Sequence, residues 1–335
     1  MTSRIVGGSP LGGLLAIHAH PDDETLSTGA LLATWAASGR PVTVVTCTRG
    51  ERGEVIPAVL AHLAGDARAL AAHREGELAA ALAALGVSEQ VFLDRLPDGG
   101  VPDGGVPDGG ATPRFADSGM AWVRPGQAAA PETVPPDAFV RVPVAGAAAR
   151  VAGLIRSMRP DVVVGYEPGG GYGHPDHVHA HRVMRRAVEL AASEAPGAEP
   201  YRVPVVLWAV LDATARRAAL AELTGLAAVT ELTADGTLAP ERAEASGPSA
   251  EVAVGIDIRV PLEPVVDRLA AALRAHATQV QGVRTWLAGA GASVGCFALS
   301  NRVLQPLLAQ ECYRVDPTWP PGTVVWPTGV TAGRA

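Results

Sequence analysis

The chain has 335 residues, of which 48% are hydrophobic, so it can bury the core of one large domain or of a main domain with a smaller appendage. Its formal net charge is −7, and its basic residues are scattered rather than gathered in a stripe. This charge pattern argues against a nucleic-acid-binding protein.

Strand and helix patterns alternate along the first two thirds of the chain. Buried strands are predicted at 12–19, 41–48, 88–96, 161–168 and 202–211. Helices are predicted between them at 24–38, 66–86, 145–160 and 175–195. Gly39 and Gly86 stand at the ends of two of these helices, and Pro175 is in the first turn of another. This alternation predicts an α/β fold, namely a Rossmann-like, mostly parallel sheet with helices on both faces.

Two polar stretches interrupt this pattern. Residues 97–110 repeat Pro-Asp-Gly-Gly three times, which predicts a surface loop; their three aspartates leave ion binding as the alternative. Residues 232–250 are a second polar insertion, and a strand at 252–258 and a helix at 262–281 are predicted after it. We expect a Rossmann-like core over residues 10–211 and a C-terminal portion over 212–335 that packs on this core.

The three cysteines, Cys47, Cys296 and Cys312, form no CxxC pair, and an odd number argues against a disulfide framework. A reduced cytosolic setting is the simpler interpretation. The N-terminal apolar stretch is too short and too rich in histidine for a signal peptide, and no run approaches the roughly 18 apolar residues of a membrane span. We therefore expect a soluble cytoplasmic protein with no nucleic-acid or membrane partner; the sequence leaves its oligomeric state open.

Residues 16–25, AIHAHPDDET, gather metal-capable side chains directly after the first predicted strand. His20 and Asp23 are three positions apart at a strand-to-helix turn, so one tight turn can aim both at a single point. An imidazole nitrogen and a carboxylate oxygen suit zinc, and also iron or another divalent ion. If Asp23 binds a metal, Asp22 stands beside it, free to take a proton from bound water. The alternative is a capped helix start, because Asp-Asp-Glu is also good helix N-terminal chemistry.

Residues 169–181, GGGYGHPDHVHAH, follow the fourth predicted strand and repeat the His-Pro-Asp pattern. His177 is i,i+3 from His174 and i,i+4 from His181, so these side chains share one helix face. A site of three histidines is one hypothesis. A more economical site takes one ligand from this cluster and two from the first, which leaves a position for water as in catalytic zinc sites. Both clusters follow strands of the predicted sheet, where such sheets bind ligands.

The two His-Pro-Asp motifs resemble those of the LmbE/PIG-L family of metal-dependent deacetylases, which act on N-acetylglucosamine-containing molecules. The resemblance covers nearly the whole chain. It is closest to the branch that deacetylates N-acetylglucosaminyl-inositol in mycothiol biosynthesis. The segments that carry it are AHPDDE (19–24), VTCTRGERGEV (45–55), AHREGELAAALAALGV (72–87), FADSGM (115–120), GHPDHV (173–178), AHATQV (275–280) and FALSNRV (297–303).

This resemblance implies hydrolysis of the N-acetyl amide of a small amino-sugar inositol, giving acetate and a free amine. It implies one zinc ion per chain, bound by His20, Asp23 and His177, with ferrous iron as the alternative metal. Asp22 would be the general base and afterwards the general acid. Such a division of roles agrees with the chemistry, because amide hydrolysis needs a nucleophile, a proton carrier and an oxyanion stabiliser.

The resemblance also assigns roles around the metal. His174 would stabilise the oxyanion, with Asp176 beside it to orient or tune it. Tyr172 would swing in on its glycine-rich loop to polarise the amide carbonyl. Arg74 and Asp117 match positions that hold the sugar-inositol hydroxyls. The Pro-Asp-Gly-Gly tract departs from the family pattern close to Asp117.

Several other functions compete with deacetylation of this substrate. An amidase that cleaves mycothiol S-conjugates shares the metal site, but TLSTGA (25–30) resembles the deacetylase branch, and Ser27 stands near where the amidase branch has lysine. A deacetylase for another N-acetylglucosamine-containing molecule is a further alternative. A non-catalytic sugar-binding module would lack Asp22 or a metal ligand. A dinucleotide-dependent oxidoreductase needs a GxGxxG after the first strand, where this chain has acidic residues.

Overall fold

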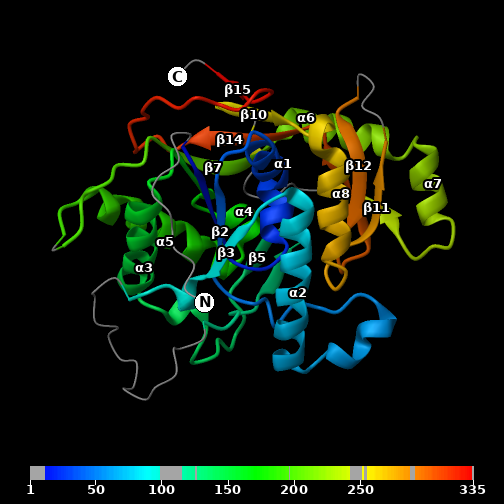
Figure 1. Ribbon diagram of the computed structural model, residues 1–335. Helices are drawn as coiled ribbons and strands as arrows, with labels where there is room; N and C mark the ends of the chain where they lie inside the picture. Colours follow the sequence, from blue (N-terminus) through cyan, green and yellow to red (C-terminus); the bar gives the residue numbers. More distant parts are fainter. Residues whose placement is uncertain are drawn as a thin grey trace.

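A nine-stranded sheet runs through the centre of the molecule (Figure 1). The computed structural model describes residues 12–98, 115–124, 127–195, 197–241, 251–252, 255–286 and 291–333. Five neighbouring strands of the sheet are parallel; in spatial order they are β7 (Val205–Asp212), β6 (Val162–Tyr166), β1 (Leu14–His18), β2 (Val42–Thr46) and β3 (Glu89–Phe92). Helices cover both faces, so the predicted α/β class with a mostly parallel sheet is confirmed.

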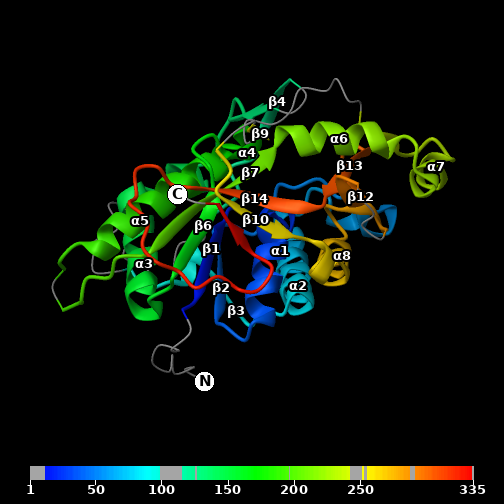
Figure 2. The same cartoon turned by 90° about the horizontal axis from the view of Figure 1, so that it is seen from above.

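The alternation of side chains along β1 explains the two helical layers. Leu14 and Ala16 point into one buried cluster, and Leu15 and Ile17 point into the other, because successive residues of a strand face opposite sides. Figure 2 shows the helices on either side of the sheet. One layer contains α1 (Asp23–Ala37), α2 (Ala67–Leu85) and α8 (Val266–Ala275); the other contains α3 (Val144–Met158) and α5 (Pro175–Ala192).

The helix boundaries follow from capping chemistry. Asp66 begins α2 by accepting hydrogen bonds from the N–H groups of Arg68 and Ala69. Gly86 ends the same helix at a φ of 84°, a conformation that glycine adopts without strain. Pro175 occupies the first turn of α5, where its missing N–H costs no hydrogen bond.

Strands from the C-terminal part extend the main sheet. β14 (Gln310–Val315) pairs antiparallel with β7, then β10 (Ile258–Pro261) with β14 and β15 (Thr331–Ala332) with β10. β9 (Glu251–Val252) pairs parallel with the end of β7. The main sheet therefore takes strands from both sides of residue 211, and the division into 10–211 and 212–335 stays a prediction.

A smaller sheet lies beside the main one, and two short elements lie near the glycine-rich loop. The smaller sheet contains β11 (Gln281–Thr285), β12 (Ser293–Ala298), β13 (Val303–Leu308) and β8 (Ala239–Pro240), with α6 (Ala213–Leu223) and α7 (Ala227–Thr233) around it. A two-stranded hairpin, β4 (Ala121–Arg124) and β5 (Gln127–Ala129), packs through β5 on the short α4 (Gly170–Gly173).

Three predicted elements differ from the structure. The helix predicted at 262–281 ends at Ala275, because His276 leaves the helical conformation, and 281–285 form β11. The strand predicted at 88–96 ends at Phe92 and continues as a short 3-10 helix. The strand predicted at 252–258 is not continuous, since residues 255–257 lie outside strands. Residues 99–110 of the Pro-Asp-Gly-Gly tract and 242–250 of the polar insertion lie outside the described residues.

The three cysteines are buried and unpaired. Across the described ranges, we find no helix that combines the length and apolar character needed to cross a bilayer.

The core on the α1 face predicts a stability difference between two apolar truncations. Leu31 on α1 is fully buried, so Leu31→Ala should lower the free energy of unfolding by about 2–5 kcal/mol. Val59 is 82% exposed, so Val59→Ala should change it by less than about 0.5 kcal/mol. Urea unfolding followed by circular dichroism measures both, and equal losses would contradict this account of the core.

Candidate metal centre and active site

The two polar clusters meet where β1 and β6 end side by side. These strands pair in parallel, so the segments that follow them leave the sheet at the same edge. The first segment turns into α1, and the second passes through α4 into α5. β2 lies on the other side of β1, so β1 is in the middle of the parallel strands. Open α/β sheets bind ligands beyond the carboxyl ends of such strands.

Three side chains from the two segments converge on one point. The Nδ1 atom of His20 lies 3.2 Å from a carboxylate oxygen of Asp23 and 3.3 Å from Nε2 of His177, and Nε2 of His177 lies 3.3 Å from the other Asp23 oxygen. Ligand atoms bound about 2.0–2.1 Å from a tetrahedral zinc lie about 3.3 Å from one another. The two ring nitrogens and the Asp23 carboxylate therefore have the spacing of one face of a tetrahedral metal site.

Hydrogen bonds behind the two histidines hold the ring nitrogens that point away from the common point. Nε2 of His20 donates to Asp176 at 3.1 Å, and Nδ1 of His177 donates to the Gly170 carbonyl at 3.1 Å. With these protons on the far side, each ring would present the lone pair of its other nitrogen to the common point. Histidines that bind metals are held in this way by carboxylates and backbone carbonyls, so the donor set fits a metal ion.

The electrostatics of this point favour a positive charge. Burial works to lower the pKa of His20, but Asp117, Asp176 and Asp23 together raise that pKa well above its usual range. Burial works to raise the pKa of Asp23, but His177 and His20 hold it well below its usual range. A cation between these groups replaces the proton that they otherwise attract.

Two other groupings of metal-capable atoms, neither with Asp23, lie within 4.8 Å of one another in the described residues. The first is His20, His174 and His177, and the second is His20, Asp117, His174 and Asp176. The second grouping is less suited to a metal because its carboxylates are already occupied. Ser118 donates to both oxygens of Asp176, at 2.9 Å and 2.5 Å, and the N–H groups of Arg52 and Gly119 donate to Asp117.

Asp22 lies in the turn between His20 and α1, with an unusual backbone. Its φ of 107° and ψ of −34° are outside the conformations that a non-glycine residue normally adopts. Arg74 of α2 donates to its carboxylate at 3.2 Å, and Glu24 accepts from its N–H at 2.9 Å. Burial raises the pKa of the Asp22 carboxyl to about 6, against the lowering effect of Arg74. Such a pKa suits a group that both takes and gives a proton near neutral pH.

His174 stands at the start of α5 in its neutral form. Burial lowers its pKa to about 2, and the neighbouring His20 and His177 add to this effect. Its Nδ1 accepts from the N–H of Asp176 at 3.1 Å, so its proton is on Nε2. The backbone of Asp176 thus orients His174, while the Asp176 carboxylate orients His20.

Tyr172 reaches the same cluster from the glycine-rich loop. Its ring packs edge-on against His177, with 5.1 Å between ring centroids, and stacks on Trp122 of β4 at 5.7 Å. Gly173 allows this approach: its φ is 91°, and a Cβ there would lie 2.6 Å from the carbonyl oxygen of Ala128.

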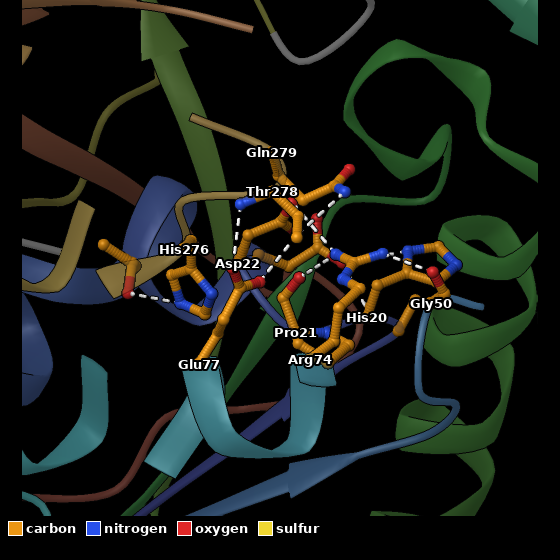
Figure 3. A network of polar contacts seen from close by, with 12 residues as sticks. His20, Pro21, Asp22, Gly50, Arg74, Glu77, His276, Thr278 and Gln279 are labelled. Carbon is orange, nitrogen blue, oxygen red and sulfur yellow. Dashed lines mark hydrogen bonds and ion pairs between the residues drawn. The ribbon is translucent and has the colours of Figure 1, made fainter. Parts of the chain in front are cut away.

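Arg74 and Asp117 lie at the site but contact protein groups. Arg74 donates to the Gly50 carbonyl at 2.5 Å and also to the Pro21 carbonyl, as Figure 3 shows. Asp117 has a carboxylate oxygen 3.7 Å from Nε2 of His20. The structure thus brings all nine predicted site residues together, and their roles stay predictions.

Sequence reasoning missed several groups that support the site. Ser118 holds Asp176, and Tyr166 stacks on His177 with ring centroids 4.2 Å apart. His276 bonds Glu24 at 2.7 Å. Ser118 and His276 lie in the FADSGM and AHATQV segments, so the resemblance pointed to these segments without giving their contacts.

Comparisons with known proteins agree with this site. Residues 15–188 match the family model described as PIG-L, GlcNAc-PI de-N-acetylase. Three similar curated proteins are each named 1D-myo-inositol 2-acetamido-2-deoxy-alpha-D-glucopyranoside deacetylase. The protein from Kineococcus radiotolerans is 44% identical, covering 90% of this chain and 76% of its own. That from Rhodococcus opacus is 43% identical, covering 89% of both chains. That from Thermobispora bispora is 40% identical, covering 96% of this chain and 92% of its own.

The convergence of His20, Asp23 and His177 predicts the metal content of two histidine variants. His177→Ala removes one of three ligands, so the metal content should fall from about one ion per chain to a small fraction after dialysis. His73 lies on α2 with a side chain 36% exposed and its Nε2 3.4 Å from Glu77, which is not among the proposed ligands, so His73→Ala should keep the metal. Elemental analysis of both proteins measures this difference. Full metal content in His177→Ala would remove it from the ligand set.

Proposed function

We propose, on the premise that the chain belongs to the PIG-L family of de-N-acetylases, that it hydrolyses the N-acetyl amide of N-acetylglucosaminyl-inositol. The products are acetate and glucosaminyl-inositol, and the reaction is a step of mycothiol biosynthesis. The observation that carries this proposal is the convergence of His20, Asp23 and His177, with Asp22 next to them in the sequence. The chain is also at least 40% identical to the three inositol deacetylases described above. A cytoplasmic location stays a prediction.

The metal would be one zinc ion held by Nδ1 of His20, the carboxylate of Asp23 and Nε2 of His177. Zinc supplies a water of lowered pKa and a positive charge that polarises the amide carbonyl. Ferrous iron accepts the same nitrogen and oxygen donors and is the alternative.

Asp22 is the proton carrier of the proposed reaction. Its carboxylate takes a proton from the attacking water and then gives it to the departing amine nitrogen. The buried environment that raises the pKa of Asp22 to about 6 makes both transfers feasible near neutral pH. Arg74 holds one oxygen of the carboxylate, which leaves the other oxygen for the water.

Two donors serve the carbonyl oxygen as negative charge develops on it. His174 offers the proton on Nε2, since its Nδ1 is engaged by the Asp176 backbone. Tyr172 offers its hydroxyl, and burial keeps it protonated by raising its pKa well above the usual range. Donors aimed at this oxygen stabilise the transition state, and losing one typically costs about 10²–10³ in rate.

Arg74 and Asp117 are the proposed contacts for the hydroxyls of the sugar and inositol rings. A guanidinium has five N–H donors, and three hydrogen bonds to protein groups use part of them. Arg74 would therefore contact the substrate through its remaining N–H donors, or through an N–H that it shares between a protein acceptor and the substrate.

Asp22→Asn should abolish proton transfer while keeping the metal. The amide has the size of the carboxylate but cannot accept the proton, so kcat should fall by about 10²–10⁴-fold. Amine release and metal content are measured on the same protein sample. Turnover at the parent rate would exclude Asp22 as the base, and loss of metal would place it among the ligands.

A paired turnover assay distinguishes the proposed substrate from its alternatives. Metal-loaded protein is given N-acetylglucosaminyl-inositol or a mycothiol S-conjugate, and amine release is followed for each. Higher kcat/KM for the first supports the deacetylase, and higher kcat/KM for the second supports the amidase. Turnover of neither, with turnover of another N-acetylglucosamine-containing compound, would move the activity to a different substrate.

A further inference from the structure

The backbone at Asp22 needs support from its surroundings. A non-glycine residue with a φ of 107° is strained, and such a conformation persists only where neighbouring groups over-determine it. The carbonyl of Asp22 accepts from the N–H groups of Thr25 and Leu26, which anchors the turn to the start of α1. These two bonds hold only the carbonyl, so other groups must orient the N–H and the carboxylate of Asp22.

Two charged side chains supply those partners. Arg74 holds the carboxylate of Asp22 and the carbonyl of Pro21. Glu24 accepts from the Asp22 N–H through its Oε2 atom at 2.9 Å. Glu24 is fully buried, so its orientation depends on what its second oxygen contacts.

The second oxygen of Glu24 is held by His276. Nε2 of His276 donates to Oε1 of Glu24 at 2.7 Å, and the hydroxyl of Thr25 donates to the same oxygen at 2.5 Å. His276 comes directly after α8, 252 residues along the chain, and is fully buried. Its Nδ1 makes no hydrogen bond to any group in the described ranges, so the ring acts through Nε2 alone. Figure 3 shows His276, Asp22 and Arg74 in one network of polar contacts.

We propose that His276 is a positioning residue for Asp22, acting through Glu24. The chain of contacts runs from His276 Nε2 to one Glu24 oxygen, and from the other Glu24 oxygen to the Asp22 N–H. It makes the segment after α8 part of the apparatus that orients the proton carrier. The proposal rests on the proposed function in one respect, which is that Asp22 is the base. The competing account is that His276 and Glu24 only fasten this segment to the core.

Other bonds keep the segment in place without His276. Thr278 donates to Glu77 through its N–H at 2.8 Å and its hydroxyl at 2.6 Å. Gln279 donates to the Glu54 carbonyl at 2.8 Å, and the Thr278 carbonyl accepts from Ile56 at 3.0 Å. A change at His276 alone should therefore leave the segment attached, so its effect on Asp22 can be measured in a folded protein.

Two variants of similar polarity separate the proposal from its competitor. The amide nitrogen of His276→Gln can reach the place of Nε2, whereas that of His276→Asn reaches only the place of Nδ1. We expect His276→Gln to keep most of kcat. We expect His276→Asn to lower kcat by on the order of ten- to a hundredfold, with KM and metal content unchanged, because a small misplacement of a catalytic group has effects of this size.

A double-mutant cycle tests whether the effect passes through Glu24. If it does, His276→Asn should add little to the kcat loss of Glu24→Gln. Arg185→Gln is the matched control: it breaks the ion pair between α5 and Asp316, another link between the C-terminal part and the core, and should lower Tm without lowering kcat.

Crystal structures of the two His276 variants give a readout that does not depend on turnover. Asp22 should keep its positive φ in His276→Gln and leave it in His276→Asn. If the parent protein fails to turn over the proposed substrate, the proposed function fails, while this comparison still tests the positioning role. Equal kcat in the two variants, a loss confined to KM or metal content, additive losses in the cycle, or a His276→Asn protein that does not fold would overturn the proposal.

Discussion

The hydrogen bond from Nε2 of His20 to Asp176 is the contact on which the site depends. It joins residues 156 positions apart and determines that Nδ1 is the nitrogen that faces Asp23 and His177. Ser118 in turn holds Asp176, so a side chain outside both His-Pro-Asp motifs orients a proposed metal ligand. Since β1 and β6 are neighbours in parallel, the sheet brings the two motifs close enough for this bond to form. The rest of the proposed chemistry follows from which nitrogen is left bare.

The different roles proposed for the two adjacent aspartates follow from the difference in their surroundings. Asp23 lies between two histidines that hold its pKa low, as a metal ligand requires. Asp22 is one residue earlier, has a positive φ, and its burial raises its pKa to about 6. Neighbouring carboxyls whose pKa values are driven apart are a common arrangement in hydrolytic sites. The turn geometry at Asp22 is therefore as important to the proposed mechanism as the identity of the side chains.

The sequence predicted the parts of this structure that depend on local patterns. Apolar runs, together with end and start signals such as Gly86 and Pro175, predicted the parallel strands and most helices. Two polar clusters after strands predicted where the site lies. Contacts between distant segments could not be found in this way. The hydrogen bond between His276 and Glu24 has no local sequence signature. The helix was therefore predicted to continue to residue 281, whereas it ends at Ala275, directly before His276. Asp176 was predicted to orient His174 alone. Its carboxylate also contacts His20, which the spacing along α5 cannot show.

The central claim is that one metal ion lies on the Nδ1 side of His20, with Asp22 beside it as a base. Anomalous diffraction from crystals of the zinc-loaded protein tests this claim most directly. The account predicts a single peak about 2.0–2.2 Å from Nδ1 of His20, the Asp23 carboxylate and Nε2 of His177, with Asp22 outside the coordination sphere. A peak on the Nε2 side of His20, among His174, Asp117 and Asp176, would contradict the ligand set and the mechanism built on it.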